Sequence, residues 1–383
     1  MTINNMSELS YVTKIFAKKE NLCIISYIDT DVHVTDEILK NKLLQVCLKI
    51  PILKQYFVEN NGITIKDVED FEIKDHYTII EDSYENFDSY LDTIISSTFT
   101  TKSRWTCNYI SDTKNKKYRI YFKIDHAYAD GYKVIDITMA YLNGTYQKPV
   151  KKNTSYLHNL YYITFGTILI TINIIIFLAN VLLSPKVKTS NKKVDYIKCK
   201  PFSLSRIKKL DKITVNDFLY AVMIKTDYLY TNIPRNIITT SPITISSKFN
   251  NILPVYIKIN NNTTTLLNDV HEIFNRYKYS LYVPIFSKIL NYVTNIIPLS
   301  IICDAFDYVT QRIDYVYTNI IGPTHEEIKD AHVITIPQNC EIVFNIISSD
   351  DNINLICSFK EDVIQDKKRY EECIYKAYES LLT

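Results

Sequence analysis

The stretch SRWTCNYISDTKNKKYRIYFKIDHAYADGYKVIDITMAYLNG, residues 103–144, is the part of the sequence that best predicts the fold. Residues 103–110 and 118–124 are rich in aromatic and β-branched side chains, and the polar residues 111–117 separate them, which predicts a β-hairpin. Residues 131–144 follow with apolar side chains at helical spacing and end at a glycine, which predicts a helix. The stretch therefore predicts a mixed α/β unit.

The link between the second strand and the helix, DHAYADGY at residues 125–132, is the strongest candidate for a catalytic motif. Moving an acyl group from a thioester to an alcohol requires a base that removes the hydroxyl proton, and an imidazole, here that of His126, suits this role. Asp130 would brace the loop without accepting the proton, and Gly131 would permit a backbone angle that other residues resist. The same letters equally fit a surface loop in which Asp130 caps the following helix.

The rest of the chain indicates two lobes of mixed α/β structure. Its 383 residues are too many for one compact core and fit two lobes of ordinary size. Helix and strand patterns alternate in each half, so we expect lobes at 1–146 and 195–383, joined by a linker at 147–194. Outside the opening stretch, the pattern predicts helices at 36–50, 214–230 and 367–382 and strands at 341–349 and 352–359.

The linker includes a hydrophobic segment, residues 160–183, that contains no charged side chain and is long enough to cross a bilayer as a helix. A single crossing would separate the two lobes and any site between them. A returning segment could only be 281–303, which contains Lys288 and two prolines. We therefore favour a helix that lies along a membrane surface over a spanning helix or an internal linker helix. Lysines on both sides leave its orientation undecided: Lys151, Lys152, Lys186, Lys188, Lys192 and Lys193.

The composition excludes several classes of function. The chain has 44 Lys and Arg against 42 Asp and Glu residues, a net charge of +2, so no nucleic-acid partner is expected. Its eight cysteines are scattered singly, which is typical of buried, reduced thiols in an intracellular protein. The N-terminus lacks the charged-then-apolar pattern of a secretory leader. The seven histidines are not clustered with the cysteines, so we expect no metal site.

Segments in both halves resemble those of the wax ester synthase/diacylglycerol acyltransferase (WS/DGAT) family and occur in the family's order. Residues 125–131 resemble the family's active-site motif HHxxxDG, with Asp125 in place of the first histidine. TVND at 214–217 resembles the start of a family helix. Two of the five glycines, Gly131 and Gly322, lie inside matching segments. The other matches are PILKQYF (51–57), VEDFEIKDHYTI (68–79), SRWTCNYI (103–110), TNIIGP (318–323) and EIVFNIISSDDNINLICSF (341–359).

The resemblance implies an α/β fold of two lobes of the chloramphenicol acetyltransferase type with a tunnel between them. It implies that His126 is the catalytic base, and the residues implied to support the site are Asp125, Asp130 and Gly131. Fatty acyl-CoA would be the co-substrate, with no bound cofactor. A hydrophobic alcohol, either diacylglycerol or a long-chain alcohol, would be the acceptor. The residues that it places at the tunnel are Asn216, Asp217, Asn319 and Gly322.

Two other functions fit the same sequence. The chain could transfer acyl groups to a small non-lipid acceptor, as other acyltransferases with an HxxxD motif do, and acceptor preference would separate the two. It could also be a non-catalytic lipid-binding relative, which the replacement at Asp125 favours and the retained His126 and Asp130 oppose. For the lipid enzyme we expect an intracellular protein at a membrane or lipid-droplet surface, attached through residues 160–183.

Overall fold

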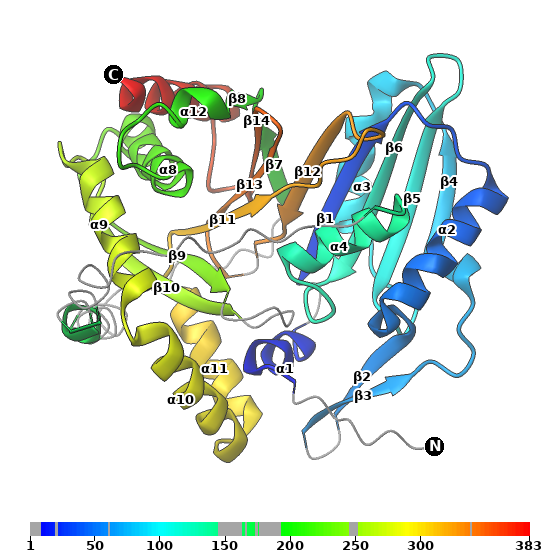
Figure 1. The fold of residues 1–383 in the computed structure, drawn as a ribbon, viewed down its shortest axis with the longest axis horizontal. Helices are drawn as coiled ribbons and strands as arrows, with labels where there is room; N and C mark the ends of the chain where they lie inside the picture. Colours follow the sequence, from blue (N-terminus) through cyan, green and yellow to red (C-terminus); the bar gives the residue numbers. More distant parts are fainter. Residues whose placement is uncertain are drawn as a thin grey trace.

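The computed structural model of the chain places two β-sheets side by side, each with helices packed against it (Figure 1). The first sheet has the strand order β12-β1-β6-β5-β4, and the second has the order β10-β9-β11-β13-β14-β7, with β8 paired to β14. A separate ribbon is formed by β2 and β3. The residues that the structure describes are 9–19, 22–59, 62–144, 163–164, 167–172, 175, 193–244, 252–337 and 339–383.

The strands of the first sheet and the ribbon are β1 (Cys23–Thr30), β4 (Tyr77–Glu81), β5 (Trp105–Asp112), β6 (Lys117–Asp125), β12 (Asp330–Thr335), β2 (Gln55–Glu59) and β3 (Ile63–Asp67). Those of the second sheet are β7 (Val194–Lys198), β8 (Phe202–Ser203), β9 (Asn236–Thr244), β10 (Ile252–Asn260), β11 (Tyr315–Ile321), β13 (Ile342–Ser349) and β14 (Asn352–Lys360). The helices are α1 (Tyr11–Ala17), α2 (Asp36–Lys49), α3 (Phe87–Ser96), α4 (Gly131–Tyr141), α7 (Leu204–Ile207), α8 (Val215–Thr231), α9 (Leu266–Tyr279), α10 (Tyr282–Ile296), α11 (Leu299–Thr310) and α12 (Lys367–Leu382). Short 3-10 turns lie at Pro51–Lys54, Ile73–His76 and Tyr84–Asn86.

The hairpin and the helix predicted from residues 103–144 are confirmed. β5 and β6 pair antiparallel, with Trp105 opposite Ile124. Asp112 holds the turn between them, because its Oδ1 accepts a hydrogen bond from the backbone N–H of Asn115 at 2.9 Å. α4 begins directly after Asp130 and ends at Tyr141, three residues before the glycine that the sequence marks as its end.

The helices and strands predicted elsewhere in the chain are confirmed as α2, α8, α12, β13 and β14. Each of the three helices begins after a side chain that accepts a hydrogen bond from a free backbone N–H of the first turn: Thr35, Thr214 and Asp366. At α8, Asp217 returns a bond to the backbone N–H of Thr214, which completes a capping box. The local sequence signals therefore place the helix starts well.

Each sheet has its own hydrophobic core. The first core contains Trp105 and Tyr128 among side chains from α1, α2 and α4. The second contains Phe218 and Phe344 among side chains from α8, α9 and α12. The prediction that the thiols are buried is confirmed for seven of the eight cysteines, and Cys340 is partly buried.

Strand β12 crosses from the second half of the chain into the first sheet, where it pairs antiparallel with β1. Its other side is bonded to the second sheet. The backbone N–H of Thr335 donates to Asn345 Oδ1 at 2.8 Å, and the carbonyl of Thr335 accepts from Ser358 Oγ at 2.7 Å. The expected division into lobes at 1–146 and 195–383 stays a prediction. β12 falls within the second of these ranges but belongs to the first sheet.

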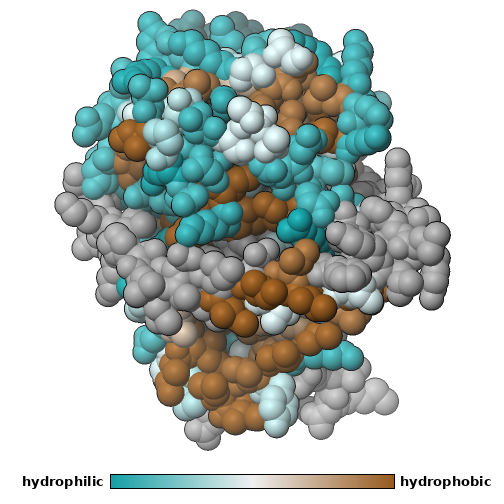
Figure 2. All heavy atoms as spheres, turned by 90° about the vertical axis from the view of Figure 1, so that its left-hand side faces the viewer, coloured by the Kyte–Doolittle hydropathy of each residue, from teal (hydrophilic) through white to brown (hydrophobic). Residues whose placement is uncertain are grey.

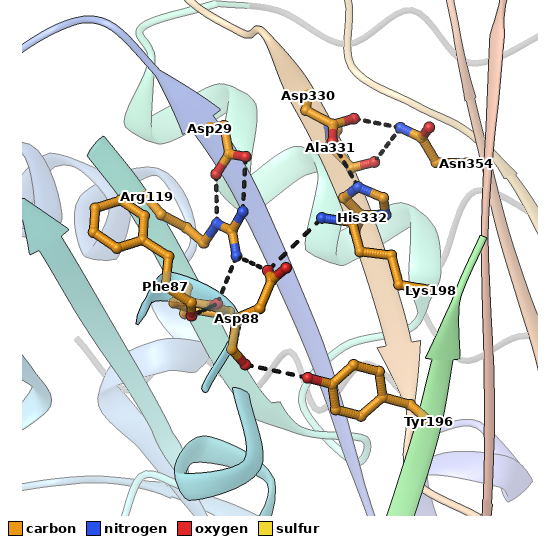
Figure 3. Close-up of polar contacts among 11 residues, drawn as sticks. Asp29, Phe87, Asp88, Arg119, Tyr196, Lys198, Asp330, Ala331, His332 and Asn354 are labelled. Atoms are coloured by element: carbon orange, nitrogen blue, oxygen red, sulfur yellow. Dashed lines mark hydrogen bonds and ion pairs between the residues drawn. The ribbon is translucent and has the colours of Figure 1, made fainter. Parts of the chain in front are cut away.

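A second junction between the halves is centred on the guanidinium of Arg119, which is buried in the first sheet (Figure 3). Arg119 Nε and Nη2 donate to the two carboxylate oxygens of Asp29 at 2.5 and 2.9 Å, and Nη1 donates to Asp88. From the second sheet, Lys198 Nζ lies 3.8 Å from the Asp88 carboxylate, and Tyr196 donates to the Asp88 carbonyl at 3.1 Å. Strand β7 is therefore bonded to the first lobe at α3.

Most of the hydrophobic segment 160–183 lies outside the described residues. Among the residues that are described, no helix combines the length and the apolar character that a membrane crossing requires. The other candidate, 281–303, forms the two helices α10 and α11, which are separated at Pro298. They have 15 and 12 residues, whereas a spanning helix needs about 20.

We expect Arg119→Ala to lower the free energy of unfolding by about 3–5 kcal/mol, because the variant leaves the Asp29 carboxylate in a buried position without its partner. The measurement is equilibrium unfolding in urea at pH 7. Arg206→Ala is the matched control, since Arg206 pairs with Glu379 at the exposed surface and should cost at most about 1 kcal/mol. Equal losses in the two variants would contradict this role of Arg119.

Candidate functional site

The turn that contains His126 links the end of β6 to the start of α4. The backbone N–H of His126 donates to the carbonyl of Leu22 at 2.7 Å, next to the start of β1. The backbone N–H of Tyr128 donates to the carbonyl of Asp125 at 2.9 Å, which closes the turn. Asp125, Tyr128 and Asp130 are buried, whereas His126 is only partly buried. The turn is thus fixed by its neighbours and leaves part of the imidazole accessible.

Asp125 braces this turn from inside. Its Oδ1 accepts from the backbone N–H of Ala127 at 2.8 Å, and its Oδ2 lies 3.2 Å from Arg104 Nε. Burial raises the pKa of Asp125 to about 6, against the opposing effects of Arg104 and the Ala127 amide. The carboxylate that replaces the first histidine of the family motif is therefore used to hold the turn.

Asp130 and Gly131 form the junction between the turn and α4. Asp130 Oδ1 accepts from the backbone N–H of Lys133 at 2.8 Å, so the side chain caps the helix. The backbone angle expected for Gly131 is wrong, because its φ is not positive. Gly131 instead lies close to the second lobe: a Cβ there would lie 2.2 Å from Ile320 Cδ1, so that side chain would have to shift.

The imidazole of His126 lies against an aromatic side chain of α1, which in turn contacts one of α11. Its ring centroid is 4.5 Å from that of Phe16 in α1, at an interplanar angle of 57°. Phe16 in turn lies 6.2 Å from Phe306 of α11 in an edge-to-face contact. One wall of the site is therefore apolar, and it is built from a helix of each half of the chain, α1 and α11. Figure 1 shows α1 between the first sheet and the α10–α11 pair.

The residues predicted for the second lobe are only partly brought together. Asn319 lies next to Ile320 in β11, and its Nδ2 donates to Asn216 Oδ1 at 3.4 Å. Gly322 packs against β13, where a Cβ would lie 2.8 Å from Ile347 Cγ1 and 3.0 Å from the carbonyl of Ser348. Ile320 thus approaches Gly131 across the lobe contact, Asn319 joins β11 to the start of α8, and Gly322 shapes the end of β11.

Asp217 has a different setting from the other predicted residues. It is buried, it completes the capping box of α8, and its Oδ2 lies 2.7 Å from His271 Nδ1 of α9. His271 Nε2 is 2.9 Å from Asn275 Nδ2. These contacts join α8 to α9. A role of Asn216, Asp217, Asn319 or Gly322 in lining a tunnel stays a prediction.

Four residues of this site were not predicted: Arg104, Phe16, Phe306 and Ile320. A signal for Arg104 was present, because a hairpin with Trp105 opposite Ile124 places Arg104 opposite Asp125. No comparable signal exists for the other three, since their contacts depend on how distant helices and strands pack.

The second half of the chain also matches a known family: residues 251–382 match the WS/DGAT C-terminal domain. The predicted likeness to WS/DGAT proteins is therefore confirmed, and with it the prediction of an acyltransferase-type chain. Among curated proteins, none matches this sequence.

Solved structures extend the likeness to the whole chain. The wax ester synthase/diacylglycerol acyltransferase from Marinobacter aquaeolei VT8 is 12% identical, with a TM-score of 0.60 and 97% of each chain covered. TRI3 trichothecene 15-O-acetyltransferase from Fusarium sporotrichioides is 9% identical, with a TM-score of 0.65. The match covers 97% of this chain and 94% of the TRI3 chain. The starter condensation domain of rhizomide synthetase RzmA, solved with C8-CoA, is 8% identical, with a TM-score of 0.58. The match covers 97% of this chain and 90% of the RzmA domain. The predicted α/β fold of two chloramphenicol acetyltransferase-like lobes is confirmed.

The raised pKa of Asp125 predicts a specific dependence of stability on pH. Between about pH 4 and pH 6 the folded state binds the Asp125 proton more tightly than the unfolded state, so stability should fall as pH rises through this window. Relative to Asp125→Asn, the wild type should lose roughly 2–3 kcal/mol between pH 4 and pH 7. Urea unfolding of both proteins across that range measures the difference. A difference that does not change with pH would contradict the prediction. The difference in stability between the wild type and Asp31→Asn, a substitution at an exposed carboxylate, should show no such fall between pH 5 and pH 7.

The close approach of Gly131 to Ile320 is testable by a double-mutant cycle. Gly131→Ala should destabilise the protein by about 1–3 kcal/mol, because the added Cβ meets Ile320 Cδ1. Ile320→Val removes that methyl group, so Gly131→Ala should cost clearly less in this background. Additive effects in thermal unfolding would show that the two residues do not meet.

Proposed function

We propose that the protein transfers a fatty acyl group from acyl-CoA to the hydroxyl of a hydrophobic alcohol, either diacylglycerol or a long-chain alcohol, with His126 as general base. The observation that supports this most directly is the position of His126. It lies partly exposed on a braced turn, beside an apolar wall and at the contact with the second lobe. The WS/DGAT C-terminal domain in the same chain supports the choice of reaction.

In this mechanism the imidazole takes the proton of the acceptor hydroxyl as the oxygen attacks the thioester carbonyl. A C–O bond forms, the tetrahedral intermediate collapses, and the C–S bond breaks. The CoA sulfur then leaves with the proton that the imidazole has held. Asp125 and Asp130 act through the turn: the first holds its backbone with Arg104, and the second fixes the start of α4. These two are positioning residues.

The nature of the substrates follows from the surroundings of the turn. Phe16 and Phe306 provide an apolar wall suited to an acyl chain or a lipid acceptor. Asn319 Oδ1 is buried and has no hydrogen-bond partner among the described residues, so it is available to a donor group of a substrate. Acyl-CoA as the co-substrate, without a bound cofactor, agrees with the C8-CoA named for the rhizomide synthetase domain.

The cellular setting that fits this function is an intracellular membrane or lipid-droplet surface, where a lipid acceptor is concentrated. We propose residues 160–183 as one attachment, because they contain no charged side chain. The fold itself does not select the acceptor, since the solved structures similar to this chain include a wax ester synthase and a trichothecene acetyltransferase. A small non-lipid acceptor is therefore tested in the same assay.

We expect His126→Ala to reduce acyl transfer by at least about a hundredfold, because the variant lacks the base that takes the hydroxyl proton. The assay is the release of free thiol from palmitoyl-CoA with diacylglycerol, with a long-chain alcohol, and with a short soluble alcohol. His33→Ala, at an exposed histidine of the same lobe, should keep full activity. Unchanged activity in His126→Ala would exclude this mechanism. Thiol release that depends on the short soluble alcohol and not on either lipid acceptor would assign the chain to the small-acceptor class.

A further inference from the structure

The helices α10 and α11 expose a continuous aliphatic surface. In α10, exposed side chains recur at spacings of four, three and four residues, so they lie on one side of the helix. The surface continues through the turn into α11. Figure 2 shows the corresponding hydrophobic patch in the lower part of the molecule, at the level where Figure 1 places the two helices. We call it the α10–α11 face: Leu281, Ile285, Ile289, Tyr292, Ile296, Ile297 and Ile301.

The described part of the hydrophobic segment lies next to this face. The backbone N–H of Leu281 donates to Thr167 Oγ1 at 3.0 Å, which joins residues 167–172 to the start of α10. Ile170 of this segment is buried in the second core, whereas Ile168 and Ile172 are exposed. The segment is therefore anchored on one side and extends the exposed aliphatic surface on the other.

The charges around the face favour a lipid surface over a protein partner. Between residues 281 and 303 the only charged side chain is Lys288, which is exposed. The described residues 167–172, which lie next to the face, also contain no charged side chain. Lys288 thus lies within the apolar residues of α10, whereas the exposed Asp304 follows Ile301, the last residue of the face, in α11. Apolar side chains with a lysine among them complement acyl chains beneath phosphate headgroups. The face contains one aromatic residue, Tyr292, and no Met or Arg, whereas protein interfaces favour aromatic residues, Met and Arg at their centres and are depleted in Lys.

The face is also close to the candidate base. Phe306, on α11, contacts Phe16 at 6.2 Å, and Phe16 contacts His126 at 4.5 Å. Lys19, just after α1, forms an ion pair with Asp307 of α11, which fastens α1 to the helix pair. The α10–α11 pair thus contacts α1, the helix that contacts His126, and exposes its own apolar face elsewhere.

We propose that the α10–α11 face docks the protein on a lipid surface that contains anionic phospholipids, with the isoleucine side chains among the acyl chains and Lys288 at the phosphates. Two helices of 15 and 12 residues, separated at Pro298, are too short to span a bilayer, so they lie on it. That the docked surface also supplies the acceptor rests on the function proposed above.

The test is flotation of the full chain with vesicles of phosphatidylcholine, with or without phosphatidylglycerol. The wild type should bind, more strongly to the anionic vesicles. Ile289→Asp with Ile296→Asp should lower binding by about tenfold or more, because two carboxylates enter the face that meets the acyl chains. The matched control is Leu48→Asp with Ile233→Asp, which removes two exposed aliphatic side chains elsewhere and changes the net charge equally. Circular dichroism and thermal unfolding establish that both variants fold.

Lys288→Gln should weaken binding to the anionic vesicles and leave the weaker binding to phosphatidylcholine unchanged. No binding by the wild type, or equal loss in the two double variants, would overturn the proposal. The proposal would also be overturned if the wild type formed a dimer that did not bind vesicles, and if Ile289→Asp with Ile296→Asp dissociated that dimer. The face would then join two copies of the chain. Vesicle binding that the face variants abolish supports docking whether or not the protein transfers acyl groups. Acyl transfer to diacylglycerol in vesicles should fall in the same variants, while transfer to a soluble alcohol should not.

Discussion

The pairing of β12 with β1 is the contact on which the arrangement of the two halves depends. β12 comes from the second half of the chain and completes the first sheet, and Asn345 and Ser358 bind its other side from the second sheet. A shift of one sheet against the other would leave these buried polar groups without partners, which is costly. The position of β11 relative to the turn of His126 is thereby fixed, and Gly131 can approach Ile320 closely.

The candidate site is consequently built from both halves. The first half supplies His126, the proposed base, with Asp125 and Arg104, and the second half supplies Ile320 and Asn319. The negative charge of Asp125 is opposed by a guanidinium and used to hold a backbone turn. The neighbouring imidazole contacts the ring of Phe16. A polar turn beside an apolar wall suits the proposed acyl transfer to a lipid alcohol, and the same wall connects the turn to the exposed α10–α11 face.

The parts of the site that come from the two lobes were predictable to different degrees. The hairpin, the turn and α4 follow from periodicity and from the spacing of Asp130 and Gly131, and the register of the hairpin already places Arg104 opposite Asp125. The reason for Gly131 was predicted wrongly, because a glycine that permits an unusual φ and one that makes room for a neighbour look the same in sequence. Asp217 matches the family motif as Asn216 does, yet its side chain faces α9.

The sequence by itself determined the helices and strands, their caps, the histidine turn and the likeness to the WS/DGAT family, because these depend on side chains a few residues apart. Only the tertiary structure decided that β12 joins the first sheet, that Phe16 lies between His126 and Phe306, and that apolar residues of 281–303 form an exposed face. Apolar periodicity shows that a helix has a hydrophobic side, but not whether that side is covered. Whether it is covered depends on which distant elements pack together.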